Sequence, residues 1–157
     1  MDTKIQFMNK NLKKTFVILG LMMLITSSTF AQQISLFDRN GEARAYIDFG
    51  RNTTIFMWDG TPVAFLERAG RNFGVIGFNG QFLGWYNMEL GIMYDRRGNV
   101  VGARRGAINM AERPERAKGA QRAMPARPAT PAAPAQPVFN NRWSNLSLTE
   151  FLHIGRR

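Results

Sequence analysis

Between residues 33 and 106 apolar and polar positions alternate in short runs, and turn signals interrupt these runs at regular intervals. Four segments align on one pattern: an aromatic residue, then Asp or Asn, then a turn glycine, and a small residue four positions later. The turn glycines are Gly41, Gly60, Gly80 and Gly98, at spacings of 19, 20 and 18 residues. Asp-Gly or Asn-Gly between apolar runs is the strongest short-range sign of a β-hairpin. The pattern therefore predicts four copies of one hairpin unit.

Several of the expected strands are apolar on both faces, as in residues 55–58 and 75–78. A single hairpin cannot bury two faces and is marginal in water. An array of near-equal hairpins solves this best by closing on itself, which also removes the sheet edges. We expect an all-β fold, a small closed or nearly closed ring with four-fold pseudo-symmetry. Small residues at one matched position are expected near the axis, where backbones crowd: Ala45, Ala64, Gly84 and Gly102.

Aromatic residues recur at two matched positions of the repeat, before the turn and after the small residue. They are Phe37, Trp58, Phe78 and Tyr94, and then Tyr46, Phe65 and Trp85. With the aromatic–Asp–Gly steps and the repeat period, residues 33–106 resemble the four-fold β-flower domain. The resemblance implies a shallow ring of hairpins behind an exported N-terminus and carries no settled activity. That fold has been likened to Tubby-type domains, some of which bind lipid head groups. The Tyr-Asp repeats of toxin shells and the Trp-Gly repeats share the Asp-x-x-Gly hairpin, but they usually form longer arrays.

The N-terminus has the layout of a secretory signal peptide: a basic region, the ten-residue apolar run 16–25, and small residues at Thr29 and Ala31 before a cleavage point. The alternative is a transmembrane anchor, which needs ~20 apolar residues. We expect residues 1–31 to be removed and the rest to reach the periplasm, the outer envelope or the medium. The chain contains no cysteine, so a lipid anchor at the cleavage point, disulfides and thiolate metal sites are excluded.

After the fourth repeat the composition changes. Residues 107–137 are basic and then Ala/Pro-rich, which predicts a disordered linker because this composition cannot build a core. Residues 138–157 regain apolar character, and the capping-box spacing of Ser147 and Glu150 predicts a helix over 148–153. A helix this short is unstable alone, so we expect it to dock on its own ring or on a partner. The docking residues are expected to be Trp143, Leu148, Phe151 and Leu152. The expected division of the chain is 1–31, 32–106, 107–137 and 138–157.

Of the net charge of +10, residues 1–31 carry +3, and the remaining +7 belongs to the tail rather than to the ring. Residues 32–103 hold seven Arg and seven acidic residues, whereas residues 104–127 hold seven basic residues against two acidic ones. This basic stretch is a candidate for contact with an anionic surface. The alternative is a solubilising charge on a flexible tail. We expect no nucleic-acid partner for an exported chain.

Three aspartates, Asp38, Asp59 and Asp95, occupy equivalent turn positions, where a ring could gather them for calcium binding or acid–base chemistry. The third copy has Asn79 instead, which keeps the turn function and discards the charge, so we interpret the set as turn formers. The only histidine is His153, which excludes His clusters and His-based triads. No phosphate-binding glycine loop occurs. We expect no enzyme activity, no cofactor and no metal site.

Aromatic residues at matched repeat positions are more often core than surface, because large rings dominate burial. A ring of this size nevertheless has a thin core and leaves one apolar face to be covered. The seven repeated aromatic residues are therefore the candidate binding face. The leading hypothesis is a non-enzymatic exported module that binds a lipid or an envelope protein on this face. The alternatives are a structural or self-assembling protein whose C-terminal segment docks on the ring, and a small hydrolase using the turn aspartates.

Overall fold

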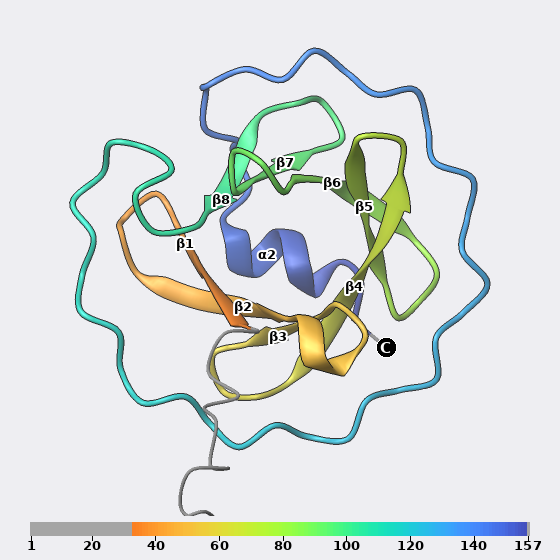
Figure 1. Cartoon of the computed structure of the whole chain (residues 1–157), viewed down its shortest axis with the longest axis horizontal. Helices are drawn as coiled ribbons and strands as arrows, with labels where there is room; N and C mark the ends of the chain where they lie inside the picture. The colour runs from red at the N-terminus through yellow and green to blue at the C-terminus, as the bar shows by residue number, and fades with distance from the viewer. Residues whose placement is uncertain (1–32, 157) are drawn as a thin grey trace, which may run out of the picture. The chain divides into compact units, whose positions relative to one another are not determined.

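The computed structural model describes residues 33–156; the predicted signal peptide lies outside them. Eight antiparallel strands follow one another in sequence order around a closed barrel, and β1 pairs with β8 to complete it (Figure 1). The strands are β1 Gln33–Phe37, β2 Ala43–Asp48, β3 Thr54–Met57, β4 Pro62–Ala69, β5 Asn72–Gly77, β6 Phe82–Asn87, β7 Ile92–Asp95 and β8 Val100–Ala103. A 3-10 turn, η2 (Phe49–Arg51), joins β2 to β3, and the helix α2 spans Leu148–His153. The predicted all-β ring of four hairpins with a short C-terminal helix is confirmed.

The four hairpins turn at the four repeated glycines, all of which adopt positive φ, between 70° and 85°. In each hairpin the Asp or Asn side chain accepts the backbone N–H two residues further on. These bonds measure 2.8–3.0 Å and join Asp38 to Asn40, Asp59 to Thr61, Asn79 to Gln81, and Asp95 to Arg97. A register shift at the same place in every hairpin marks a bulge, which adds local twist. Contrary to the expectation from the sequence, the aspartates are not equivalent: Asp38 and Asp95 are the first residue of their turns, whereas Asp59 and Asn79 are the third. Because a side-chain oxygen at either position accepts a turn N–H, the turn interpretation still accounts for all four copies.

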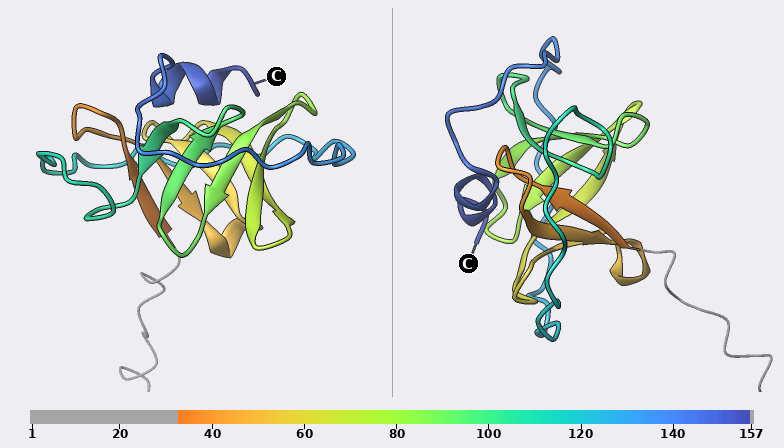
Figure 2. Two further views of the ribbon diagram at one scale, coloured as in Figure 1. Left: turned by 90° about the horizontal axis from the view of Figure 1, so that it is seen from above. Right: turned by 90° about the vertical axis from the view of Figure 1, so that its left-hand side faces the viewer.

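The inside of the barrel is one apolar cluster, and α2 lies across the mouth at the end of the hairpin turns (Figure 2). The helix begins at the predicted capping box, in which Ser147 and Glu150 each bond to the other's backbone N–H. Leu148, Phe151 and Leu152 point into the barrel and are at most 1% exposed. The helix therefore completes the core that the eight strands leave open.

The small residue of each repeat makes room for this helix. Ala45 and Ala64 belong to the interior cluster. A Cβ added to Gly84 would lie 3.0 Å from the Phe151 ring, and one added to Gly102 would lie 3.0 Å from the Leu148 side chain. The matched small residues thus lie on the inside of the barrel, as the repeat pattern predicts.

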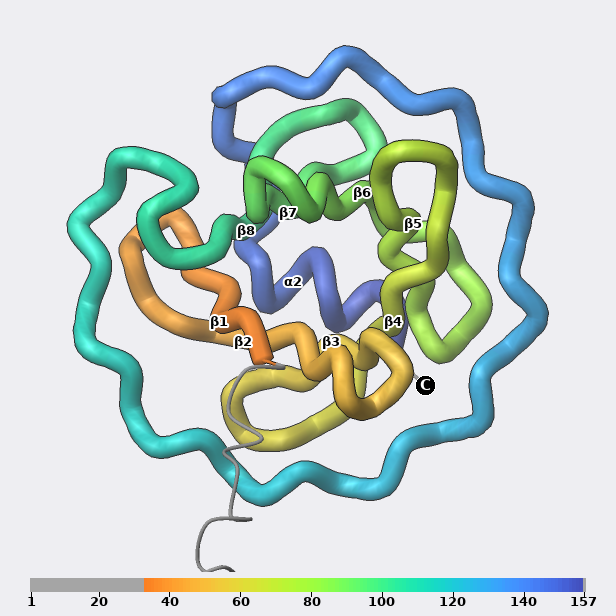
Figure 3. The backbone as a smooth tube through the Cα atoms, viewed as in Figure 1, coloured from red at the N-terminus to blue at the C-terminus, as the bar shows by residue number. Residues whose placement is uncertain are grey.

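Residues 104–147, which we call the belt, contain no helix or strand and run around the outside of the barrel past the four turns (Figures 1 and 3). Belt N–H groups donate to the carbonyl oxygens of three turn glycines. The pairs are Arg113 with Gly41 at 2.8 Å, Arg122 with Gly60 at 2.9 Å, and Asn140 with Gly98 at 3.0 Å. The belt lacks regular secondary structure, as expected for a linker, but these bonds correct the expectation that it is disordered.

The belt residues that bond to the turn glycines are spaced at multiples of nine residues. Arg113 and Arg122 are nine residues apart, and Asn140 is two such periods beyond Arg122. The intervening position is Pro131, which has no N–H to donate. At this third turn the Pro128 ring lies beside the turn glycine instead, since a Cβ added to Gly80 would be 3.6 Å from it.

Proline spacing explains how this part of the belt stays extended without a core. Prolines occur at every third position over residues 125–137: Pro125, Pro128, Pro131, Pro134 and Pro137. A polyproline II helix has three residues per turn, so in that conformation these prolines share one edge. All except Pro134 are half-buried, whereas the alanines that follow the first four prolines are exposed. One edge of a stiff, extended segment therefore faces the barrel.

Candidate functional site

The seven aromatic residues predicted as a binding face lie beneath the belt. Six of them are at most 3% exposed: Phe37, Phe78, Tyr94, Tyr46, Phe65 and Trp85. Trp58 is half-buried, and its indole N–H donates to the carbonyl oxygen of Arg116 in the belt at 3.1 Å. The chain itself therefore covers the face that the sequence suggests for a ligand.

Belt side chains pack against successive aromatic rings of the barrel. The Lys118 ammonium lies 4.5 Å from the centre of the Tyr46 ring and 5.1 Å from that of Trp58. Nine residues on, the Arg127 guanidinium lies 4.3 Å from the centre of Phe65. Two further contacts complete the circuit: Arg105 lies 4.9 Å from the Phe37 ring, and Phe139 stacks on Tyr94 at 4.1 Å. Cation–π contacts of this kind stabilise the belt without burying a charge.

Three cations of the basic stretch, Arg105 among them, also pair with acidic groups of the same chain. Arg105 lies 3.1 Å from Glu112 and 3.3 Å from Glu115. Arg113 lies 2.6 Å from Glu42, and Arg122 lies 3.5 Å from Asp59. Exposed pairs of this type contribute little individually. They nevertheless show that the basic stretch, predicted as a contact for anionic surfaces, is mostly used to hold the belt.

The four residues predicted to dock the C-terminal segment divide between two places. Leu148, Phe151 and Leu152 belong to the cluster inside the barrel. Trp143 precedes the helix, forms a parallel bridge with Val100, and packs against the outer apolar cluster. The segment therefore contacts the barrel on both its inner and its outer surface.

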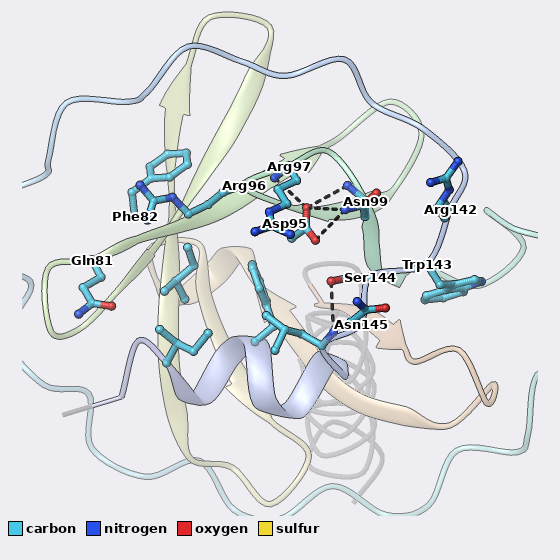
Figure 4. A pocket seen from close by; sticks show the side chains of 14 residues that line it. Gln81, Phe82, Asp95, Arg96, Arg97, Asn99, Arg142, Trp143, Ser144 and Asn145 are labelled. Carbon is cyan, nitrogen blue, oxygen red and sulfur yellow. Dashed lines mark hydrogen bonds between the residues drawn. The ribbon is translucent and has the colours of Figure 1, made fainter.

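Beside α2, a cavity of about 610 Å³ lies between the β5–β6 turn, the β7–β8 turn and the end of the belt (Figure 4). Its apolar lining comes from Phe82, Leu83, Trp143, Leu146, Phe151 and Ile154. Its polar lining comes from Gln81, Asn99, Ser144 and Asn145, together with Asp95 and three arginines, Arg96, Arg97 and Arg142. The cavity thus combines an apolar surface with a cationic rim.

The Asp95 carboxylate is hydrogen-bonded within its own turn. One of its oxygens accepts the N–H of Arg97 at 2.8 Å and that of Asn99 at 2.9 Å. Burial acts to raise the pKa of Asp95, but bonds from Asn99, Ser144 and Arg97 outweigh it, and the pKa is lowered. Asp95 is therefore an ionised turn residue rather than a proton donor at neutral pH.

The three arginines of the rim are free to meet a ligand. All three are exposed. Among the ion pairs within residues 33–156, none involves Arg96, Arg97 or Arg142. Three guanidinium groups against one carboxylate leave the rim with a net positive charge. Guanidinium groups form paired hydrogen bonds with carboxylate and phosphate oxygens.

Sequence reasoning missed this site because its residues are not part of the repeated pattern. One signal was available in the two residues before the turn glycine, since the second, third and fourth turns close in the same way. The fourth turn carries Arg96 and Arg97 there, two of the three rim arginines, where the second and third turns carry an aromatic residue and Asp or Asn. Nothing in the sequence indicated that Arg142, more than forty residues later, would join them.

The groups considered for catalysis are not brought together. Asp38, Asp59 and Asp95 sit in three different hairpin turns, and Asp95 alone lines the cavity. His153 is exposed on α2. In the part of the chain that the structure describes, no group of three or more His, Asp or Glu residues could hold a metal ion. The same part contains no helix with the length and apolar character needed to cross a membrane.

Comparison with known proteins bears on the whole of this architecture. The sequence profile of the 4-fold beta flower protein family matches residues 34–152, a range that includes the barrel, the belt and most of α2. Searches of curated proteins and of solved structures gave no match. The family match extends well past residue 106, where the resemblance seen in the repeats ends. Because it covers more than half of the sequence, it shows that this chain belongs to the 4-fold beta flower protein family.

Proposed function

We propose that this protein is a non-enzymatic module of the cell envelope that binds an anionic amphiphile, such as a single lipid, in the cavity beside α2. The observation that carries the proposal is the chemistry of the cavity lining, which joins three unpaired arginines to an apolar surface. The proposal keeps the lipid predicted from the sequence but moves its site, because the belt covers the aromatic face. The β-flower family is not a known enzyme family.

The dimensions and chemistry of the cavity suit such a ligand. Small-molecule sites range from about 300 to 1,000 Å³, and their polar groups are few and orient the ligand. Here Arg97 and Arg142 would bind the acidic head, while Trp143, Leu146 and Ile154 would contact the hydrocarbon chain. Burial of the chain contributes about 0.8 kcal/mol per CH₂ group, so chain length should determine affinity.

Titration calorimetry with dodecyl phosphate, kept below its micelle concentration, tests this proposal. We expect saturable binding by the full chain, and weaker binding of the uncharged dodecanol. Arg97→Gln should weaken binding about tenfold or more, since a hydrogen bond to a charged group contributes about 1.5–3 kcal/mol. Arg68→Gln, an exposed arginine at the other end of the barrel, is the matched control and should have no effect. Absence of binding, or equal binding by both variants, would refute the proposal.

A second candidate is a purely structural protein, in which the C-terminal segment only stabilises the ring. It is favoured by the observation that α2 fills one apolar face of the barrel and the belt covers the other. On this view dodecyl phosphate does not bind, and deletion of residues 138–157 changes the oligomeric state. Light scattering of the full and truncated chains decides: a monomer in both cases counts against assembly.

A further inference from the structure

We propose that the α2 end of the barrel, defined by the four hairpin turns, the belt and α2, docks on an anionic lipid bilayer. The inference rests on the proposed function for the class of ligand, a lipid. The surface that carries it extends well beyond the cavity. Three features support it: the distribution of net charge between the two ends, the unpaired arginines at one end, and the exposed apolar residues beside them.

The two ends of the barrel differ in charge. Residues 33–156 carry 16 basic and 10 acidic residues, a net charge of +6. The three connections at the end opposite α2, with the strand ends beside them, hold three arginines and three acidic residues: Arg51, Arg68, Arg71, Asp48, Glu67 and Glu89. Arg104, which donates to carbonyl oxygens of that end, adds one charge there. Five of the six net positive charges therefore belong to the α2 end and to the belt beyond Arg104.

At the α2 end the acidic groups are already engaged, and the one in the second turn, the exposed Asp59, lies 3.5 Å from Arg122. Asp38 and Asp95 are buried in their turns. Glu42 pairs with Arg113 at 2.6 Å, and Glu150 bonds to the N-cap of α2. Outside residues 104–141, the exposed arginines of this end are Arg39, Arg96, Arg97, Arg142 and Arg156, of which Arg39 donates to the carbonyl oxygen of Ser144. A negatively charged surface would meet cations here with few competing carboxylates.

Apolar side chains are exposed at the same end. Leu146 is 39% exposed just before α2, and Ile154 is 46% exposed just after it. Both flank the cavity mouth. Basic residues around exposed apolar side chains are typical of surfaces that bind the bilayer interface, where the apolar groups enter the acyl boundary and the cations meet the head groups. This charge complementarity favours an anionic bilayer over a neutral one.

Vesicle flotation of the full chain tests the inference. The vesicles are phosphatidylcholine alone, or phosphatidylcholine mixed with phosphatidylglycerol. We expect binding to the anionic vesicles only, weakened by salt. The double variant Arg96→Gln/Arg97→Gln should bind roughly 30-fold more weakly, since each arginine near an anionic bilayer contributes about fivefold. The matched control Arg68→Gln/Arg71→Gln, two exposed arginines at the opposite end, should bind like the wild type.

Two results would overturn the docking surface. The first is that the wild type does not bind anionic vesicles, or binds neutral vesicles equally well. The second is that the two double variants lose vesicle binding to the same extent. The apolar contribution has its own variant, Leu146→Ser/Ile154→Ser, which should also weaken flotation. Dodecyl phosphate binding separates this inference from the proposed function. Binding of the soluble amphiphile without flotation overturns the docking surface and leaves the cavity in place. Flotation that depends on Arg96 and Arg97, without binding of the soluble amphiphile, overturns the cavity proposal and supports docking.

Discussion

Replacing Phe151 with alanine tests whether α2 is part of the barrel core. The Phe151 side chain is 1% exposed and belongs to the interior cluster, where its ring faces Gly84. Removal of a buried phenylalanine ring costs about 3–5 kcal/mol, through lost burial and the cavity that remains. Domains of this size are stable by only about 5–15 kcal/mol. We therefore expect Phe151→Ala to remove a large fraction of the free energy of unfolding.

The measurement is urea unfolding followed by tryptophan fluorescence, with the free energy of unfolding and its dependence on urea both fitted. Thr149→Ala, a half-buried position on the same helix, is the control and should change the free energy of unfolding little. If Phe151→Ala releases α2 instead of leaving a cavity, the urea dependence should also fall, because less surface is exposed on unfolding. A loss below about 1 kcal/mol with unchanged urea dependence would show that α2 does not close the core, since a fully buried ring cannot be removed so cheaply.

Three further outcomes follow from the structure. Lys118→Gln removes two cation–π contacts and should lower the free energy of unfolding by about 1–2 kcal/mol in the same urea assay; no change would show that this part of the belt does not stabilise the barrel. Gly102→Ala places a Cβ 3.0 Å from Leu148 and should cost about 1–3 kcal/mol by overpacking; a neutral result would mean that α2 shifts freely. Turn N–H bonds lower the pKa of Asp59, and at Asp95 burial raises the pKa but the turn bonds outweigh it. Both folded pKa values lie below 3.8, so the stabilisation that these carboxylates contribute is present above about pH 4 and is lost as the pH falls through the folded pKa values. Urea unfolding at neutral and acidic pH should show this loss of stability. Asp59→Asn should make the loss on acidification smaller.

The barrel was predictable from the sequence because its signals are local. A hairpin needs a glycine at positive φ and a side chain that can accept the next turn N–H, and both requirements appear within a few residues of Gly41, Gly60, Gly80 and Gly98. The small residue of each repeat was informative for the same reason, because crowding near the axis acts on every copy. Equal units with two apolar faces then leave closure as the favoured arrangement.

The belt was not predictable by the same reasoning. Its backbone is extended, so it has no hydrophobic period of a helix or strand, and its Pro/Ala composition is typical of linkers. The belt binds the barrel through hydrogen bonds from its main-chain N–H groups to the carbonyl oxygens of turn glycines. Such bonds cannot be recognised from the residue types of the belt. The nine-residue spacing of Lys118 and Arg127 acquires meaning only when the positions of Tyr46 and Phe65 on the barrel are known.

A ring of four equal hairpins offers four equivalent sites, so a cavity with this particular lining requires something that breaks the symmetry. In this protein the asymmetry is concentrated at the third and fourth turns. The end of α2 binds the third turn, where the Asn79 amide donates to the carbonyl oxygen of Ile154 at 2.7 Å. The fourth turn carries Arg96 and Arg97 where the second and third carry an aromatic residue and Asp or Asn, and the belt ends against it through Trp143 and Val100. The cavity lies between these two departures from the repeat. The repeat therefore builds the scaffold, and the candidate site arises where the tail makes two of its copies unequal.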